Sequence, residues 1–348
     1  MTELKEQDQA ILNYLRENPG ISSKEIHEGL GIPLSYATVK RALQALVSEQ
    51  FVRTTGKGKG TKYALSPAYF VLAPITIESY FQQEIDERNI RGAFNLQLID
   101  GVLPVIELFT KEENRFLSSL QHTFRSNTEE LSPSEFNKEF ERLAIDLSWK
   151  SSQIEGNTYS LLETERLLKE QETASGKTKD EATMLLNHKE ALDFILNHQD
   201  FVKPLTIARI EDLHSILIKE LKVGRNIRKR RVGISGTNYK PLDNEFQIRE
   251  ALQAMCDLVN GKTNVFEKAL LVLVLISYIQ PFEDGNKRTA RIISNAILMN
   301  EGYCPLSFRT VDSIDYKKAM LVFYEQNNIQ PFKRIFLDQY AFAVQTYF

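Results

Sequence analysis

Apolar residues recur at helical spacing over most of the chain, and only two short stretches, each a predicted hairpin, favour strands. Within residues 7–67 the pattern predicts three short helices and then two strands, one on each side of the turn Gly56–Gly60. Ser22 or Ser23 is placed to cap the second helix, and Ser35 to cap the third. The first part of the chain is therefore expected to be a three-helix unit that ends in a hairpin.

The rest of the chain is predicted to be almost entirely helical. Residues 110–148 carry a helical pattern that breaks near Ser132-Pro133, and residues 161–196 carry another that is interrupted at Ala174–Gly176. Residues 269–278 are apolar on nearly every side, which is typical of a helix buried in the middle of a domain. We therefore expect a mainly α fold.

The composition is that of an ordinary soluble protein. The chain has 348 residues, 42% hydrophobic and 26% charged, enough for two or three domains. The net charge of -3 excludes a chain that is strongly basic overall, and two cysteines are too few for a disulfide framework or a cysteine metal site. No signal peptide is apparent, and the longest apolar run is far shorter than the ~20 residues that cross a bilayer. We expect a cytoplasmic protein without a membrane partner.

The N-terminal unit carries a local excess of cations. Three helices followed by a basic hairpin resemble a winged helix-turn-helix domain, which implies DNA as a partner. Winged helices also serve as protein–protein modules, and the sequence leaves that alternative open. The side chains expected at DNA are Tyr36, Thr38, Lys40, Arg41, Lys57 and Lys59.

Residues 280–291 read Gln-Pro-Phe-Glu-Asp-Gly-Asn-Lys-Arg-Thr-Ala-Arg, directly after the apolar segment. A Gly-Asn turn that enters a helix directs backbone N–H groups at a phosphate. Arginines three residues apart on that helix share one face and can bind separate phosphates. Asp284 is the natural ligand for Mg²⁺, which prefers one or two carboxylates plus phosphate oxygens. The candidate phosphate ligands are Gly285, Asn286, Lys287, Arg288 and Arg291.

This stretch resembles the signature of the Fic (Fido) family. The resemblance implies a site for ATP with Mg²⁺ and transfer of AMP to a hydroxyl side chain of a target protein. Gln280 stands where the family has its catalytic histidine, and a glutamine amide is not basic. General-base catalysis contributes about 10²- to 10⁴-fold. We therefore expect ATP binding to be retained and transfer to be slow or absent.

Two further departures keep other functions open. The commonest adenylyltransferases of the family have glycine at the position of Lys287, and relatives with lysine there include the Doc toxins, which transfer phosphate. A chain that lacks the histidine also fits a non-catalytic regulator, which binds nucleotide as a signal and changes DNA binding through the winged helix. The sequence does not decide whether the chain acts alone or as a homodimer.

Ser151, Glu155 and Gly156 end a predicted helix near residues 145–157. A carboxylate in the last turn is unfavourable for the helix dipole, which indicates a partner elsewhere. These residues resemble the inhibitory motif of Fic proteins. The resemblance implies that Glu155 pairs with Arg291 and keeps the γ-phosphate of ATP from docking productively.

Residues 224–231 are densely basic, and a solvated edge is the simplest explanation for such a run. Residues 232–241 then predict a hairpin around the turn Gly236-Thr237-Asn238. The hairpin resembles the Fic flap, which implies that it clamps the target peptide by strand addition. We expect Val232, Gly233, Ile234 and Tyr239 to form this flap.

The predicted architecture is a mainly α, Fic-type helical core with a small β-hairpin flap, preceded by a winged helix-turn-helix domain. The expected boundaries are 1–70 for the winged helix, 71–110 for a connector packed on the core, 111–330 for the Fic domain and 331–348 for a C-terminal helical extension. His188, His198 and His214 are expected to be surface or packing residues, because no pair of them has metal-ligand spacing.

Overall fold

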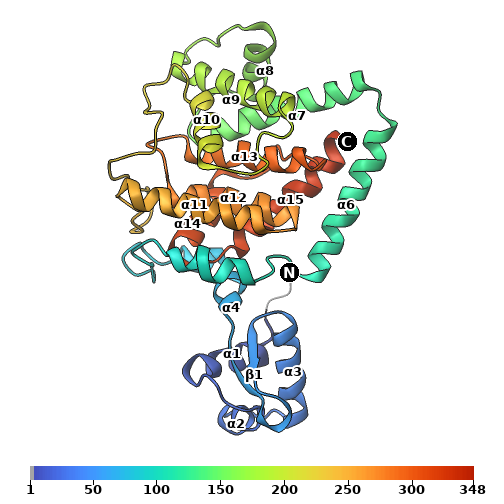
Figure 1. The fold of residues 1–348 in the computed structure, drawn as a ribbon, viewed down its shortest axis with the longest axis vertical. Coiled ribbons are helices and arrows are strands. Elements are labelled where there is room, and N and C mark those ends of the chain that lie inside the picture. The colour runs from blue at the N-terminus through green and yellow to red at the C-terminus, as the bar shows by residue number, and fades with distance from the viewer. Residues whose placement is uncertain (1–3) are drawn as a thin grey trace.

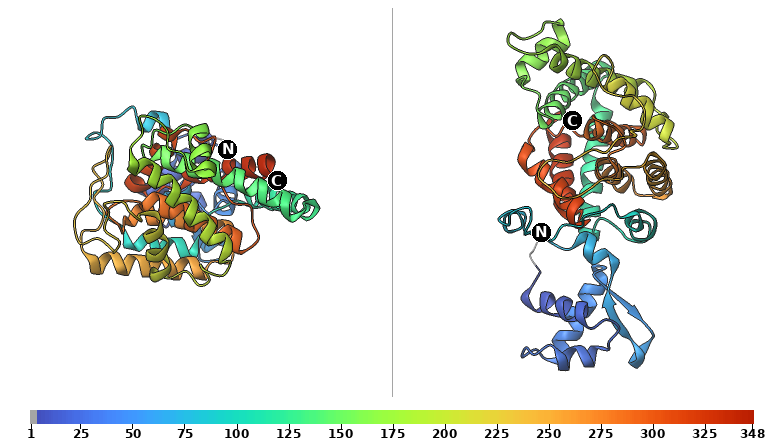
Figure 2. Two further views of the ribbon diagram at one scale, coloured as in Figure 1. Left: turned by 90° about the horizontal axis from the view of Figure 1, so that it is seen from above. Right: turned by 90° about the vertical axis from the view of Figure 1, so that its left-hand side faces the viewer.

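The computed structural model describes residues 4–348, which form a helical body with a small separate lobe at the N-terminus (Figure 1). The side view makes the lobe clearest, because it lies below the body and is joined to it through α4 (Pro67–Leu72) (Figure 2). No helix in the described part of the chain is long and apolar enough to cross a membrane.

The lobe has the predicted order of elements. Helices α1 (Glu6–Glu17), α2 (Ser23–Gly29) and α3 (Tyr36–Ser48) are followed by the antiparallel pair β1 (Val52–Thr55) and β2 (Lys62–Leu65). Ser22 caps α2 and Ser35 caps α3, as their positions in the sequence predicted. The apolar faces of the three helices are buried against one another, which confirms the winged helix-turn-helix fold.

The body is built from ten longer helices within the described residues. They are α6 (Lys111–Glu130), α7 (Pro133–Ile154), α8 (Leu161–Glu170), α9 (Lys179–Asn197), α10 (Ile207–Leu217), α11 (Glu245–Gly261), α12 (Val265–Ile279), α13 (Asn286–Asn300), α14 (Ser313–Gln326) and α15 (Gln330–Tyr347). The predicted breaks are present, since Ser132 caps α7 and residues 171–178 separate α8 from α9.

Helix α12 lies at the centre of this body. Nearly all of its residues are buried, because α11, α13, α14 and α15 pack around it. Asn264 caps its N-terminus by accepting hydrogen bonds from two backbone N–H groups. A helix that buries every face has a fixed position, and α12 therefore presents its C-terminal end, with the loop that follows, at a defined place.

The connector between lobe and body is mostly irregular. It contains the short helix α5 (Ile77–Tyr80), the π-helical turn η2 (Leu98–Val102) and the 3-10 turn η3 (Leu103–Val105). Its backbone is tied to the body by long-range hydrogen bonds, including Asn95 N–H to Tyr278 Oη at 2.9 Å. At the other end of the chain α15 packs into the core, where Phe332, Phe336 and Tyr340 are fully buried.

The predicted hairpin at residues 232–241 is wrong in one respect. The segment turns at Ser235-Gly236, but its two arms form no strand pair, and the described residues contain one sheet, β1 with β2. Arginine side chains bond carbonyl groups in and beside the segment. Arg228 donates to Arg230 O and Leu242 O, which flank it, and Arg88 donates to Gly236 O within it. Lys240 forms an isolated parallel bridge with Ala93 of the connector.

Candidate nucleotide site at the start of helix α13

The loop between α12 and α13 is shaped by two left-handed residues. Gln280 ends α12 with φ 52°, and Gly285 precedes α13 with φ 81°. A Cβ atom at Gly285 would be strained and would lie 3.4 Å from the ring of His214, so the position requires glycine. No side chain in the described structure caps α13, which leaves its first N–H groups available for an anion.

Two buried side chains hold the loop in place. Phe282 stacks on His214 with ring centroids 3.6 Å apart. His214 Nε2 bonds Asp284 O at 3.0 Å, and burial lowers the pKa of His214 to about 4, so the ring is neutral and a packing residue. Asn286 accepts from Phe282 N–H and donates to Phe282 O, both at 2.9 Å. The Asn286 side chain thus braces the loop, and only its backbone remains for phosphate.

Asp284 and Arg288 form an ion pair, with Arg288 Nη2 2.9 Å from Asp284 Oδ2. The Asp284 side chain is 57% exposed, whereas that of Arg288 is 1% exposed. Arg288 also donates to Leu217 O at 3.4 Å. One oxygen of the carboxylate therefore reaches solvent and has no assigned partner among the described residues. A metal ligand needs such an accessible oxygen. Arg288 is a buried support for Asp284 more than a free phosphate ligand.

Arg291 is completely buried and bonds the end of α7. Its Nε donates to Ser151 Oγ at 2.8 Å and its Nη2 donates to Ser151 O at 2.9 Å. Nη2 is also 3.1 Å from Glu155 Oε1. Arg291 Nη1 is buried and has no hydrogen-bond partner within residues 4–348. An unpaired buried donor is costly. The structure thus brings Arg291 and the 151–155 segment together, although they are far apart in sequence.

Glu155 is held by a second cation as well. Lys287 Nζ lies 3.2 Å from Glu155 Oε2, and the glutamate side chain is 18% exposed. Burial raises the pKa of Glu155, but the charges of Arg291 and Lys287 outweigh burial and hold this pKa below its ordinary value. Gly156 follows with φ 101°, the left-handed conformation that ends α7 and turns the chain away.

The Gln280 amide is hydrogen-bonded at both ends within its own loop. Gln280 Nε2 donates to Ser277 O at 2.7 Å, and Gln280 Oε1 accepts from Asn286 Nδ2 at 2.9 Å. Both ends of the amide are therefore fixed between the last turn of α12 and the first residue of α13. No group at this position is able to take a proton at neutral pH.

Sequence reasoning missed Arg228, which belongs to the basic run but is almost fully buried. Its Nε donates to Gln280 O at 2.6 Å, and its backbone N–H donates to Pro281 O at 2.9 Å. It therefore ties residues that flank the 232–241 segment to the loop between α12 and α13. The only hint in the sequence is its neighbour Ile227, an apolar residue inside a run of cations.

The remaining predicted residues lie in two other places. Within the 232–241 segment, Tyr239 is buried and donates to Tyr278 O at 3.1 Å, while Val232 and Ile234 are half-buried and Gly233 is exposed. In the lobe the predicted DNA contacts lie on α3 and the 55–62 turn, and Lys40 Nζ is 5.7 Å from the ring of Tyr36. The exposed side chains there are Tyr36, Lys40, Arg41, Lys57 and Lys59, and Thr38 is half-buried.

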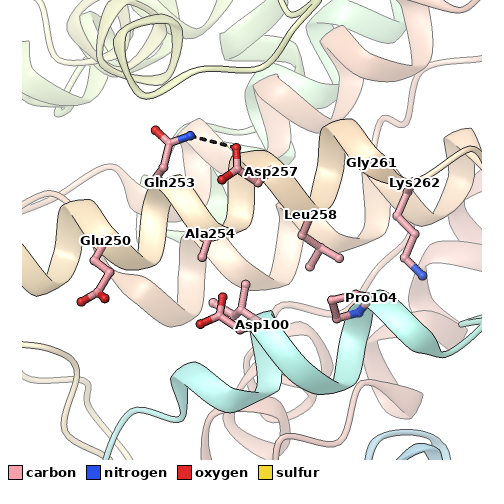
Figure 3. Close-up of a pocket in the computed structure, with 10 residues that line it drawn as sticks. Asp100, Pro104, Glu250, Gln253, Ala254, Asp257, Leu258, Gly261 and Lys262 are labelled. Atoms are coloured by element: carbon pink, nitrogen blue, oxygen red, sulfur yellow. Dashed lines mark hydrogen bonds between the residues drawn. The ribbon is translucent and has the colours of Figure 1, made fainter.

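The nucleotide loop is separate from the cavity drawn in Figure 3. That cavity has a volume of about 630 Å³ and lies between α11 and the η2–η3 turns. Its polar side chains include Asp100, Glu250 and Asp257, and the last of these accepts a hydrogen bond from Gln253 at 2.9 Å. Within the described residues no group of three or more His, Cys, Asp or Glu side chains could hold a metal ion. A metal at Asp284 would therefore depend on ligand oxygens.

Comparison with known proteins agrees with this geometry. Residues 204–298 match the Fic/DOC family, and residues 4–53 match winged helix-turn-helix DNA-binding domains. A protein adenylyltransferase Fic of Aedes aegypti is 28% identical over 195 residues, which is 53% of this chain and 38% of that protein. The corresponding protein of Nematostella vectensis is 30% identical over 192 residues, which is 53% of this chain and 44% of that protein. The aligned region spans less than half the length of these relatives.

Solved structures show the same fold. Fic-1 of C. elegans has a TM-score of 0.60 and 22% identity, covering 68% of this chain and 72% of that chain. A Fic domain containing signaling protein of Bacteroides thetaiotaomicron has a TM-score of 0.56 and 21% identity, covering 66% of this chain and 94% of that chain. The chain therefore carries a Fic/DOC family domain at residues 204–298 and an N-terminal winged helix-turn-helix domain at residues 4–53.

Proposed function

We propose that the protein binds ATP with Mg²⁺ at the start of α13 and is an adenylyltransferase-type Fic protein that Glu155 holds inactive. The observation that carries this proposal is the state of Arg291, a buried guanidinium whose donors are used by Ser151 and Glu155 while Nη1 has no partner. A buried guanidinium near an uncapped helix start can bind phosphate, and Glu155 would occupy that place in the absence of nucleotide.

The residues present fit the ligand. The uncapped start of α13 offers backbone N–H groups, and Lys287 and Arg291 offer the positive charge. Asp284 has a solvent-exposed carboxylate and would hold the metal. A Mg²⁺ ion held by Asp284 would supply positive charge to the phosphate groups of the nucleotide. Displacement of Glu155 is the step that would free Arg291 for the terminal phosphate.

The chemical step of transfer needs a general base, and none is present at the expected position. A target hydroxyl must lose a proton as its oxygen attacks phosphorus, and the side chain at the expected place is the Gln280 amide, which already bonds Ser277 and Asn286. Loss of a general base costs about 10²- to 10⁴-fold in rate. We therefore expect weak transfer of AMP or none.

A second function is favoured by the same amide. A protein that binds ATP without consuming it is a sensor, and the winged-helix lobe, with exposed cations on α3 and the wing, provides an output at DNA. In this alternative the nucleotide changes DNA binding, and no covalent product forms.

One experiment distinguishes these functions. The wild-type, Glu155→Gly, Gln280→His and doubly substituted proteins are incubated with Mg²⁺ and ATP labelled at the α- or the γ-phosphate. Incorporation of α-label by Glu155→Gly alone supports a working transferase, whereas incorporation only by the double variant supports the sensor. Incorporation of γ-label alone indicates phosphotransfer, as Lys287 permits. Failure of every variant to bind ATP in calorimetry contradicts both proposals.

A further inference from the structure

Two helix ends at the nucleotide site carry a charge of the unfavourable sign. Lys287 lies in the first turn of α13, where the helix dipole is positive, and this turn, residues 286–289, contains no acidic residue. Glu155 is the C-cap of α7, where the dipole is negative, and the last turn, residues 151–154, contains no basic residue. Since neither charge is compensated within its own helix, each needs a partner from elsewhere in the chain.

The two charges compensate each other across the helix ends. Lys287 Nζ lies 3.2 Å from Glu155 Oε2, and Arg291 Nη2 lies 3.1 Å from Glu155 Oε1. Lys287 and Arg291 are four residues apart on α13, so they lie on one face of the helix, where like charges destabilise it. The Glu155 carboxylate contacts one cation with each oxygen and offsets this repulsion.

The two cations depend on Glu155 to different degrees. Arg291 also donates two hydrogen bonds to Ser151, and its guanidinium carbon lies 5.3 Å from the ring centroid of Tyr316. Arg291 would therefore keep its place if Glu155 moved away. Lys287 Nζ has no polar partner other than Glu155 among residues 4–348. In the closed site this ammonium is thus a counter-ion of the carboxylate, although it lies in the turn that would bind phosphate.

The Lys287–Glu155 pair forms the solvent side of the closure. The Lys287 side chain is 24% exposed and that of Glu155 is 18% exposed, whereas Arg291 is completely buried. A pair with this exposure is screened less than a surface pair and avoids the full desolvation cost of a buried one. The contact should therefore give a net stabilisation of the closed site.

We propose that Lys287 is a positioning residue that locks Glu155 in the closed site and thereby opposes nucleotide binding. The inference rests on the proposed function and deepens it, since it assigns a second counter-ion to the inhibitory carboxylate. ATP must separate Glu155 from Lys287 as well as from Arg291. Removal of a cation from this site should therefore weaken ATP binding less when Glu155 is present than when it is absent.

A double-mutant cycle on the full chain isolates this effect. The affinity for ATP with Mg²⁺ is measured by calorimetry for the wild-type, Lys287→Gln, Glu155→Gln and doubly substituted proteins. Lys287→Gln removes the same charge from the phosphate site in both backgrounds, but it removes the lock only where Glu155 is present. We expect the substitution to weaken ATP binding about fivefold more in the Glu155→Gln background than in the wild-type background, the upper end of the range for exposed ion pairs. Equal factors in the two backgrounds overturn the proposal.

Two controls accompany the cycle. Lys287→Arg keeps a cation within reach of Glu155 and should behave as wild type, whereas a Lys287→Arg protein that behaves like Lys287→Gln would show that charge is not what holds the carboxylate. The matched pair is Lys169 and Glu165, which lie 2.8 Å apart on the exposed face of α8. The same cycle with Lys169→Gln and Glu165→Gln should leave ATP affinity unchanged.

Thermal unfolding without nucleotide separates failure of the inference from failure of the proposed function. Lys287→Gln should lower the Tm when residue 155 is glutamate and should not lower it when residue 155 is glutamine. If no variant binds ATP, the proposed function is contradicted and this comparison of Tm values decides the lock. If ATP binds with equal factors in both backgrounds, the nucleotide site stands and the lock is refuted. An equal fall in Tm in both backgrounds also overturns the lock.

Discussion

Glu155→Gln removes the charge at the centre of the contact between α7 and α13 and keeps the shape of the side chain. Glu155 lies 3.1 Å from the fully buried Arg291 and 3.2 Å from the partly exposed Lys287. Such a pair has a Coulomb energy of about 4 kcal/mol at an effective dielectric constant of ~20, and breaking a buried pair costs about 3–5 kcal/mol. Because Glu155 is partly exposed and Ser151 keeps two hydrogen bonds to Arg291, we expect a loss of about 2–3 kcal/mol.

The two readouts of this variant move in opposite directions. Without nucleotide, thermal unfolding followed by circular dichroism should show a Tm roughly 4–12 °C lower, at about 2–4 °C per kcal/mol for a domain of 150–250 residues. In the wild-type protein ATP must displace the Glu155 carboxylate from Arg291, and in the variant it displaces only a neutral amide. Calorimetry should therefore show ATP binding at least tenfold tighter, at about 1.4 kcal/mol per factor of ten.

The control variant is Glu165→Gln, which breaks an exposed i,i+4 pair with Lys169 on α8. It should change stability by no more than about 0.5 kcal/mol and leave ATP affinity unchanged. A Glu155→Gln protein that is destabilised but binds ATP no better would show that Glu155 is only a structural contact. A protein with unchanged Tm would refute the energy assigned to the pair.

Three further predictions concern the base, the pH dependence and the lobe. In a Glu155→Gly protein, Gln280→His should raise AMP transfer about 10²- to 10⁴-fold at unchanged ATP affinity, and an unchanged rate would show that no base is missing. The pKa of Glu155 is lower in the folded protein than its ordinary value of 4.5, so the ionised carboxylate stabilises the fold fully above pH 4.5 and this contribution is lost as the pH falls through the folded pKa. The Tm difference between wild type and Glu155→Gln should therefore be constant from pH 6 to 8 and shrink in acid. The logarithm of the DNA-binding constant falls with the logarithm of the salt concentration by about 0.9 for each phosphate contact. Lys40→Ala/Arg41→Ala removes two such cations and should reduce this slope by about 2, whereas Lys24→Ala, which removes an exposed cation of α2, should leave it unchanged.

Much of the fold could be predicted from local sequence patterns. The caps Ser22 and Ser35, the break at Ser132 and the wing strands all depend on neighbours within a few residues, and the structure has them where they were predicted. The uniformly apolar 269–278 segment could only be a central helix. Gly285 and its turn were also visible, because a left-handed residue before a helix favours glycine.

The burial and the hydrogen-bond partners of the charged side chains could not be predicted in this way. Arg228, Arg288 and Arg291 look alike in the sequence, yet all three are buried, and each bonds groups that lie more than 50 residues away in the chain. The 232–241 segment shows the same dependence on distant contacts. Its arms form no strand pair, and Arg88, which lies far away in the chain, donates to Gly236 O.

The sequence by itself therefore determined the mainly helical fold, the order of the main helices and the two wing strands, since these follow from local patterns and spacing. Only the tertiary structure decided that Glu155 is shared between Arg291 and Lys287, that the Gln280 amide accepts a hydrogen bond from Asn286, and that the connector contacts the 232–241 segment at Lys240. The physical reason is that burial and pairing fix which donors are free, and both depend on contacts between segments far apart in the chain.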